Sequence, residues 1–256
     1  MNLFDSHCHF DFDVFQGKQA AQWADCRALG VNQLLIPGVG PENWAKAQGL
    51  STALEGVYYA VGLHPWFLNG LRDLGDLTGE MTSYWQDPKC VAVGECGLDA
   101  SIETPLEQQV LILEQHLALA QSLHKPLILH VRGAHNELIS RLREANLPAG
   151  GVIHAYTGSL QQAEQYWSMG FHLGVGGAIT YERARKTRAA VAALPLESLL
   201  LETDAPDMPL SGHQGEANHP GHLPAIARSL ASLRTESLEL ICQQTTANSE
   251  KLFGIL

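Results

Sequence analysis

The chain has 256 residues, of which 45% are hydrophobic and only 17% are charged. Acidic residues outnumber basic ones by 27 to 16, and the net charge of −11 argues against a protein that coats nucleic acid through a broad basic surface. No apolar run approaches the roughly 20 residues of a membrane span, the N-terminus lacks signal-peptide features, and the five cysteines match no disulfide framework, so we expect a cytoplasmic protein with reduced thiols.

Short apolar runs alternate with stretches of helical periodicity along the chain. The runs predict eight strands, at Asn2–His7, Val31–Pro37, Val57–Gly62, Cys90–Glu95, Pro126–His130, Gly151–His154, Phe171–Val175 and Leu199–Glu202. The periodic stretches predict helices at Gln19–Leu29, Glu42–Ala53, Pro105–Leu123, Ala134–Ala145, Leu160–Met169, Arg183–Ala193 and Glu236–Phe253. The runs are short and do not alternate polar with apolar residues, which is typical of parallel strands covered on both faces.

This order of elements predicts an α/β fold: a single (β/α)8 TIM-type barrel over residues 1–256 with an extra C-terminal helix. The length agrees, because such barrels need roughly 250 residues. A doubly wound open sheet is the alternative. It gains no support from the first strand, which is not followed by a G-x-G-x-x-G motif.

Histidine and acidic residues gather at the carboxyl ends of the predicted strands, which converge on one mouth in a barrel. The first strand ends with His7 and His9, and the alternation of side chains along a strand puts both on one face. Two imidazoles about 6–7 Å apart on one face can bind the same cation. A polar strand end with two unrelated histidines is an equally good interpretation of this pair alone.

The fourth, fifth and sixth strands each end in one residue of a metal-ligand type. Glu95 follows an apolar run directly, where a carboxylate is costly to bury without a counter-charge, and it can bridge two metals. A rim salt bridge is the alternative for Glu95. His130 and His154 each end an apolar strand, where a lone histidine is usually a core residue. Two such histidines, together with the pair on the first strand, favour a metal site.

The eighth strand is followed by Asp204, which shares a face with Glu202 and lies nearer the mouth. Asp204 can bind a metal and accept a proton from an activated water. A helix cap or a loop aspartate is the alternative. The joint pattern is six ligand-type side chains, too many for one tetrahedral catalytic site, which takes three protein ligands and water. It predicts two divalent metal ions per subunit, with Zn, Mn, Co or Ni suited to the mixed ligands and Mg less so.

Several stretches together resemble the TatD family of metal-dependent deoxyribonucleases, among the amidohydrolase-like metal hydrolases. They run in order through almost the whole chain: Asp5–His9, Val61–Pro65, Val93–Asp99, Ile128–His130, His154–Gly158 and Leu201–Pro206. Leu199–Leu210 with His213-Gln214-Gly215 further resembles the YjjV-type branch.

The resemblance implies a TIM barrel, a two-metal site and hydrolysis of DNA phosphodiesters, with DNA as the partner. By position, it implies that His7 and His9 bind one metal, that His130 and His154 bind the other, and that Glu95 lies between them. Asp204 would be a ligand and the proton acceptor, so Asp204 and Glu95 are the expected catalytic residues.

Two further residues are expected on the substrate side. His64 follows the third strand and faces the same mouth, and Arg132 lies just past His130. Asp99 is expected to orient a ligand histidine. The chain also departs from the family: it has Ala217-Asn218-His219-Pro220 where the family often has Arg-Asn-x-Pro. The missing arginine weakens the nuclease interpretation in particular.

Two enzyme classes therefore remain open at this stage, beside a barrel that binds metal without catalysis. The first is a two-metal deoxyribonuclease. The second is a two-metal hydrolase of a small amide, lactone or phosphate ester. Glu95 favours the first, because the broader group commonly has a modified lysine at that place. The acidic balance and the missing arginine favour the second.

Overall fold

The computed structural model describes residues 1–68 and 75–255, in which eight parallel strands form one sheet in sequence order. The strands are β1 Leu3–Asp5, β2 Val31–Ile36, β3 Val57–Val61, β4 Cys90–Asp99, β5 Leu127–Arg132, β6 Gly151–Ile153, β7 Phe171–Val175 and β8 Leu199–Leu201. The backbone N–H of Ser6 donates to the carbonyl of Leu201 at 3.0 Å, which joins the end of β1 to β8. The predicted (β/α)8 barrel is therefore confirmed.

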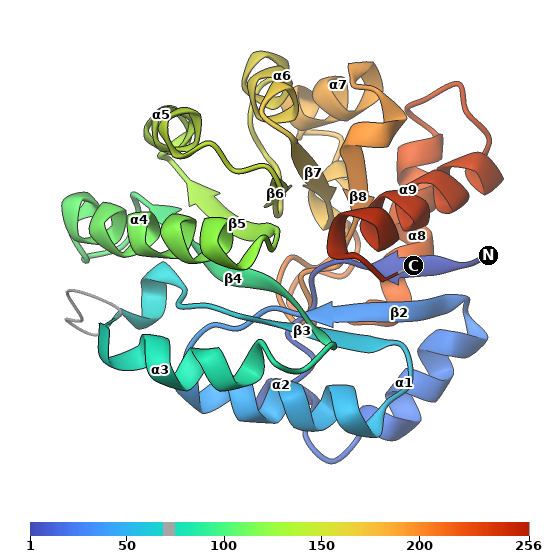
Figure 1. The fold of residues 1–256 in the computed structure, drawn as a ribbon. Coiled ribbons are helices and arrows are strands. Elements are labelled where there is room, and N and C mark those ends of the chain that lie inside the picture. Colours follow the sequence, from blue (N-terminus) through green and yellow to red (C-terminus); the bar gives the residue numbers. More distant parts are fainter. Residues whose placement is uncertain (69–74, 256) are drawn as a thin grey trace.

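Helices surround the strands (Figure 1). In the described residues the α-helices are α1 Gln19–Ala28, α2 Pro41–Ala53, α3 Gly75–Tyr84, α4 Leu106–Leu123, α5 His135–Ala145, α6 Leu160–Ser168, α7 Arg185–Ala193, α8 Leu223–Ala231 and α9 Leu238–Phe253. Short 3-10 turns are η1 Asp13–Phe15, η2 Pro65–Phe67, η3 Gly177–Thr180, η4 Leu196–Ser198 and η5 Pro220–His222. The extra C-terminal helix is α9, capped by the Ser237 hydroxyl, which accepts a hydrogen bond from the Leu240 N–H.

Two helices were not predicted from the sequence. The segment that forms α3 has two glycines and two threonines in ten residues, so its helix propensity is weak. The segment that forms α8 begins next to Pro220 and contains Pro224, which resembles a loop. Pro224 lies in the first turn of α8, where a helix needs no backbone N–H donor.

Strand ends also differ from the prediction in a way that affects the site. The strand β4 runs on to Asp99, four residues beyond Glu95, whereas β1 already ends at Asp5. His7 and His9 therefore lie in the segment after β1 and not within it. His154 likewise follows β6 directly, and Asp204 lies three residues after the end of β8.

The inside of the barrel is apolar at its amino-terminal end. Seven of the eight strands contribute at least one buried side chain to this inner cluster, which also contains Phe253 at the end of α9: Phe4, Leu35, Ala60, Val91, Ala92, Ile128, Val152, Leu200 and Phe253. The rings of Phe4 and Phe253 lie 6.0 Å apart between centroids. A second apolar layer lies between the strands and the surrounding helices. The buried histidines and carboxylates that group together lie at the opposite, carboxyl-terminal end.

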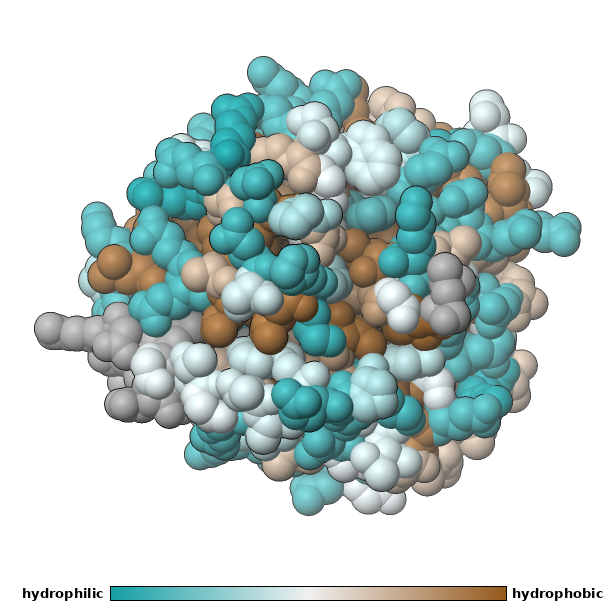
Figure 2. All heavy atoms as spheres, in the orientation of Figure 1, coloured by the Kyte–Doolittle hydropathy of each residue, from teal (hydrophilic) through white to brown (hydrophobic). Residues whose placement is uncertain are grey.

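The surface is mostly hydrophilic on the face shown in Figure 2, with hydrophobic residues in patches between the polar ones. Among residues 1–68 and 75–255, no helix has the length and hydrophobicity needed to cross a bilayer. All five cysteines are buried and unpaired: Cys8, Cys26, Cys90, Cys96 and Cys242.

Candidate functional site: a histidine–carboxylate cluster

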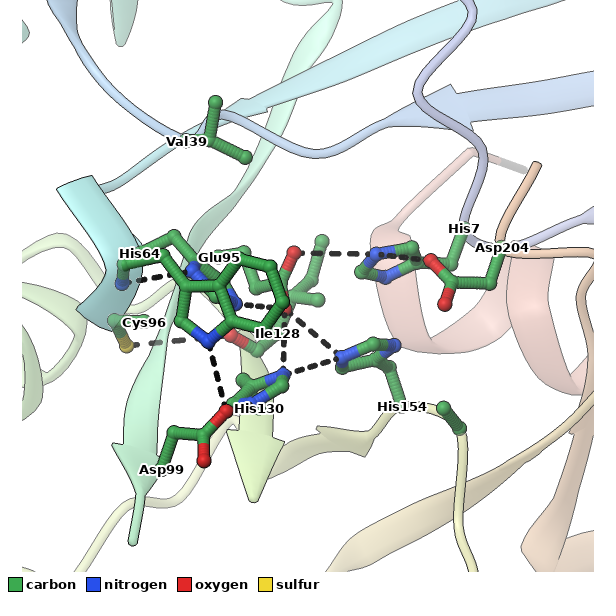
Figure 3. Close-up of polar contacts among 12 residues, drawn as sticks. His7, Val39, His64, Glu95, Cys96, Asp99, Ile128, His130, His154 and Asp204 are labelled. Atoms are coloured by element: carbon green, nitrogen blue, oxygen red, sulfur yellow. Dashed lines mark hydrogen bonds and ion pairs between the residues drawn. The ribbon is translucent and has the colours of Figure 1, made fainter. Parts of the chain in front are cut away.

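Glu95 lies at the centre of a buried polar cluster at the carboxyl-terminal mouth (Figure 3). The pairing of β4 with β5 shifts register between Gly94 and Cys96, so Glu95 sits at an irregularity in the strand. Gly94 adopts a φ of 139°, which L-residues rarely adopt, and this local backbone needs a glycine. The Glu95 N–H donates to the Gly38 carbonyl at 2.8 Å, which fixes the residue at the mouth.

The two carboxylate oxygens of Glu95 face different histidines. Oε2 lies 3.2 Å from His7 Nε2 and 3.8 Å from His9 Nε2. Oε1 lies 2.8 Å from His154 Nε2 and 3.4 Å from His130 Nδ1. The carboxylate thus divides the cluster into two sets of nitrogen atoms, and Figure 3 shows His7 on one side of it and His130 with His154 on the other.

The segment that carries His7 and His9 is held by backbone contacts to neighbouring strands. The Cys8 N–H donates to the Leu35 carbonyl at 3.0 Å, and the His9 N–H donates to the Ala205 carbonyl at 2.8 Å. The ring of Phe12 stacks on His9 with centroids 4.5 Å apart. Both imidazoles consequently point into the cluster although they follow the strand.

Asp204 closes the cluster on the His7 side. Its Oδ1 lies 3.5 Å from His7 Nε2 and 3.7 Å from His9 Nε2. Its φ of 56° is in the left-handed region, which a non-glycine residue adopts at a cost of order 1–3 kcal/mol. Its N–H donates to the His7 carbonyl at 2.9 Å, which holds this backbone against the segment that carries His7. Burial raises the pKa of Asp204 to about 7, with nearby His7 opposing the rise.

Glu202 is a member of the cluster that the sequence analysis did not assign to the site. It is fully buried, one of its oxygens accepts a hydrogen bond from the Ala155 N–H, and the other is unpartnered. Burial raises its pKa to about 8. Its ligand atom groups with those of His7 and His154. The signal was its place two residues before Asp204, on the same side of the chain. A side chain at Gly174 would collide with Glu202, so this glycine leaves the room it needs.

Asp99 fixes the orientation of His130, as expected. Asp99 Oδ2 lies 3.1 Å from His130 Nε2 and also accepts the indole N–H of Trp66 at 2.8 Å. Burial alone would raise the pKa of Asp99, but these donors and Ser101 outweigh it and hold the pKa below its ordinary value. With Nε2 donating to a carboxylate, His130 turns the lone pair of Nδ1 toward Glu95.

His64 lies inside the cluster, closer than a substrate-side residue was expected to be. Its Nε2 is 3.3 Å from Glu95 Oε1. Its Nδ1 accepts the backbone N–H of Trp66 at 3.1 Å, so neutral His64 must carry its proton on Nε2. Arg132 differs: its side chain is exposed at the end of β5, and among the described residues it takes no part in the polar contacts of the cluster.

The side chains fit divalent cations. Several buried nitrogen and oxygen atoms here have no hydrogen-bond partner, among them Nδ1 and Nε2 of His7, Nδ1 of His9 and Oε2 of Glu95. Buried polar atoms are normally paired, so unpaired atoms that converge are those expected of metal ligands. Three groups of ligand atoms lie within 4.8 Å of one another: His7 with His9 and Glu95, His7 with His154 and Glu202, and His64 with Glu95 and His130. The structure thus brings together all six predicted ligands and adds His64 and Glu202.

Comparison with known proteins agrees with this geometry. The family of TatD related DNases matches residues 4–254. The chain is 42% identical to YjjV of Escherichia coli K12, an uncharacterised metal-dependent hydrolase, over 99% of this chain and 98% of that protein. The crystal structure of YjjV has a TM-score of 0.94, at 41% identity and with 99% and 98% of the two chains covered. The 3'-5' ssDNA/RNA exonuclease TatD of Klebsiella pneumoniae is 34% identical, again over 99% and 98%. The chain therefore belongs to the TatD family of metal-dependent hydrolases.

Proposed function

We propose that the chain is a two-metal nuclease that hydrolyses phosphodiester bonds of single-stranded DNA. The observation that carries the proposal is the position of Glu95, whose two oxygens face separate sets of histidine nitrogens. A bridging carboxylate between two such sets is the arrangement of two-metal phosphodiesterases.

In this proposal His7 and His9, with Asp204, would hold one ion, and His130 and His154 would hold the other. The Glu95 carboxylate, which faces both pairs of histidines, would contribute to both sites. Mixed imidazole and carboxylate ligands suit Zn, Mn, Co or Ni, with Mg less favoured. Two bound divalent cations supply Lewis-acid activation of water and offset the charge of the phosphate.

Asp204 accepts the proton of the attacking water. Its side chain is 12% exposed, against 1% for Glu95, and its N–H on the His7 carbonyl fixes its backbone. As water attacks phosphorus, the new P–O bond forms, one water proton passes to Asp204, and the P–O bond to the departing oxygen breaks.

His64 donates a hydrogen bond to the departing oxygen, which takes its proton from solvent water. The Trp66 N–H occupies its Nδ1, so the proton of the neutral ring is held on Nε2, on the side that faces the cluster. A donor at this atom stabilises the negative charge on the oxygen as it leaves. His64 also contacts the phosphate before reaction. The Arg132 side chain is exposed at the rim, so it contacts phosphates farther along the strand.

The substrate class is supported by the relatives. The Klebsiella pneumoniae relative named above acts on single-stranded DNA and RNA from the 3' end, and it aligns with this chain over nearly its full length. The chain's net charge of −11 does not oppose this, because bound cations offset the carboxylates where a phosphate enters.

Metal content and hydrolysis measured on the same samples test the proposal. Wild type and Glu95→Gln are analysed for bound metal, and both are given a 5'-labelled single-stranded oligonucleotide. Near two metals per chain and a ladder of shortened products, both reduced in the variant, support a two-metal nuclease. Metal without any cleavage of DNA would refute the nuclease.

A two-metal hydrolase of a small amide, lactone or phosphate ester is the second candidate. One observation favours it: in the described residues, no lysine or arginine takes part in the polar contacts of the cluster. Nucleases often place such a cation on the phosphate. Assays on small esters, run beside the oligonucleotide at equal enzyme and metal concentrations, separate the two candidates by their kcat/KM values.

A further inference from the structure

Trp66 exposes a large aromatic surface directly beside the cluster. The residue lies in η2, two positions after His64, and 56% of its surface is accessible to solvent. Its ring centroid is 5.9 Å from that of His64 at an interplanar angle of 77°. Tryptophan is highly buried on average, so such exposure at the entrance of a site needs an explanation.

The indole is nevertheless fixed in place. Its N–H donates to Asp99 Oδ2 at 2.8 Å, and Asp99 is fully buried. The same oxygen lies 3.1 Å from His130 Nε2. One buried carboxylate therefore holds both a ligand histidine and the exposed indole, which sets the ring at a defined position relative to the reacting centre.

Hydrogen bonds from backbone N–H groups also fix the segment that carries the indole ring. The Leu63 N–H donates to Nε2 of His116 on α4 at 3.1 Å, and the His64 N–H donates to the Val39 carbonyl at 3.1 Å. His116 is fully buried, and its Nδ1 lies 2.8 Å from the Ile112 carbonyl. A surface that is ordered before binding loses little entropy when a ligand stacks on it.

We propose that the exposed face of Trp66 is a stacking platform for a nucleobase next to the phosphate that reacts. This inference rests on the proposed nuclease function and adds the recognition of the substrate. The ligand is an unpaired base, because a base within a duplex is already stacked on its neighbours. Every base has a π-face, so Trp66 selects single strands over duplexes with little preference for sequence.

The matched variants separate stacking from the hydrogen bond to Asp99. Trp66→Ala removes both, whereas Trp66→Phe keeps an aromatic face and loses only the indole N–H. Leu111→Ala is the control, because Leu111 is a similarly exposed apolar residue (53%) on the outer surface of α4. The melting temperature of each metal-loaded variant is measured first, so that kinetic effects are compared among folded proteins.

Three 5'-labelled single strands serve as substrates for the metal-loaded enzymes: one intact, one abasic at the 3'-terminal nucleotide and one abasic at the next. For the intact strand we expect Trp66→Ala to raise KM about 5- to 150-fold, the range of base stacking on aromatic residues. Trp66→Phe should keep KM within about threefold while lowering kcat, since stacking remains and the support of His130 is lost. On one of the two abasic strands, the KM of wild type should rise to the value that Trp66→Ala shows on the intact strand.

Two outcomes distinguish failure of the stacking platform from failure of the proposed nuclease function. Suppose that wild type cleaves the intact strand, but that Trp66→Ala leaves KM unchanged or raises it equally on all three strands. Trp66 is then not a platform for a base, and the proposed nuclease function is unaffected. If metal-loaded wild type cleaves none of the strands, the nuclease itself fails and the platform fails with it.

Discussion

Both ends of the barrel interior are buried, but apolar side chains line one end and polar side chains line the other. At the amino-terminal end, the rings of Phe4 and Phe253 pack together and the interior is apolar. At the carboxyl-terminal end, Glu95 and its histidines are equally buried but polar. Burying polar atoms destabilises a fold unless they are paired, so the apolar end supplies stability that the polar end lacks. Substitutions at one end should therefore affect activity, and those at the other should affect folding.

Glu95→Gln should give the largest effect. The amide keeps the shape but removes the charge that both sets of histidines face, so we expect loss of at least about 10³-fold in kcat/KM and of bound metal. The measurement is elemental analysis together with oligonucleotide hydrolysis. Thermal unfolding of the metal-free proteins should change little, and a large drop in melting temperature would contradict the division between the two ends.

Phe253→Ala should act in the opposite manner. Removing a buried aromatic ring leaves a cavity at the apolar end and should lower the free energy of unfolding by about 3 kcal/mol. Denaturant titration measures this loss. Activity per folded molecule should stay within about twofold because the ring lies at the opposite end of the barrel from the cluster. If kcat falls together with stability, the two ends are coupled.

His64→Ala should lower kcat by roughly 10²-fold, the usual loss when one hydrogen bond to charge that develops in the transition state is removed. Alanine removes the Nε2–H donor to the departing oxygen. The informative substrate is an aryl phosphodiester, whose departing group is stable without a proton. Its hydrolysis should be far less affected than that of DNA, and equal losses on both substrates would leave His64 with only a binding role.

His116→Gln should give the smallest effect, a change in the free energy of unfolding that depends on pH. Burial lowers the pKa of His116 to about 4, below the usual value near 6.5. Protonation is thus harder in the folded state, so its contribution is complete above pH 6.5 and is lost as pH falls toward 4. Between pH 7 and pH 5 wild type should lose on the order of 1–2 kcal/mol more stability than His116→Gln. Parallel stability curves for the two proteins would show that His116 does not titrate in this way.

Much of the fold and of the candidate site was predictable because both depend on local sequence. Short apolar runs mark the parallel strands, and a histidine or carboxylate just after such a run is rare enough to stand out, as with His130 and His154. Strand order then brings these positions to one mouth without any knowledge of side-chain geometry.

Contacts across the mouth were less predictable. The proximity of His64 to Glu95 and the shared oxygen of Asp99 depend on rotamers and on the register shift in β4, which leave no pattern in the sequence. Glu202 was not assigned to the site because Asp204, on the same face, was expected to lie nearer the mouth. Its burial beside Gly174 follows only from how closely β7 approaches β8.

The buried cysteines have a practical consequence for experiments on this protein. All five thiols are inaccessible, and burial raises the pKa of Cys26 and Cys90 to about 12, so few thiolates form at neutral pH. A cysteine introduced at an exposed position, such as Phe67→Cys beside the proposed platform, would be the one thiol that reacts readily with a maleimide dye. A fluorophore can thus be attached at the entrance of the native chain without first replacing its own cysteines, and the arrival and departure of a strand can be followed in real time.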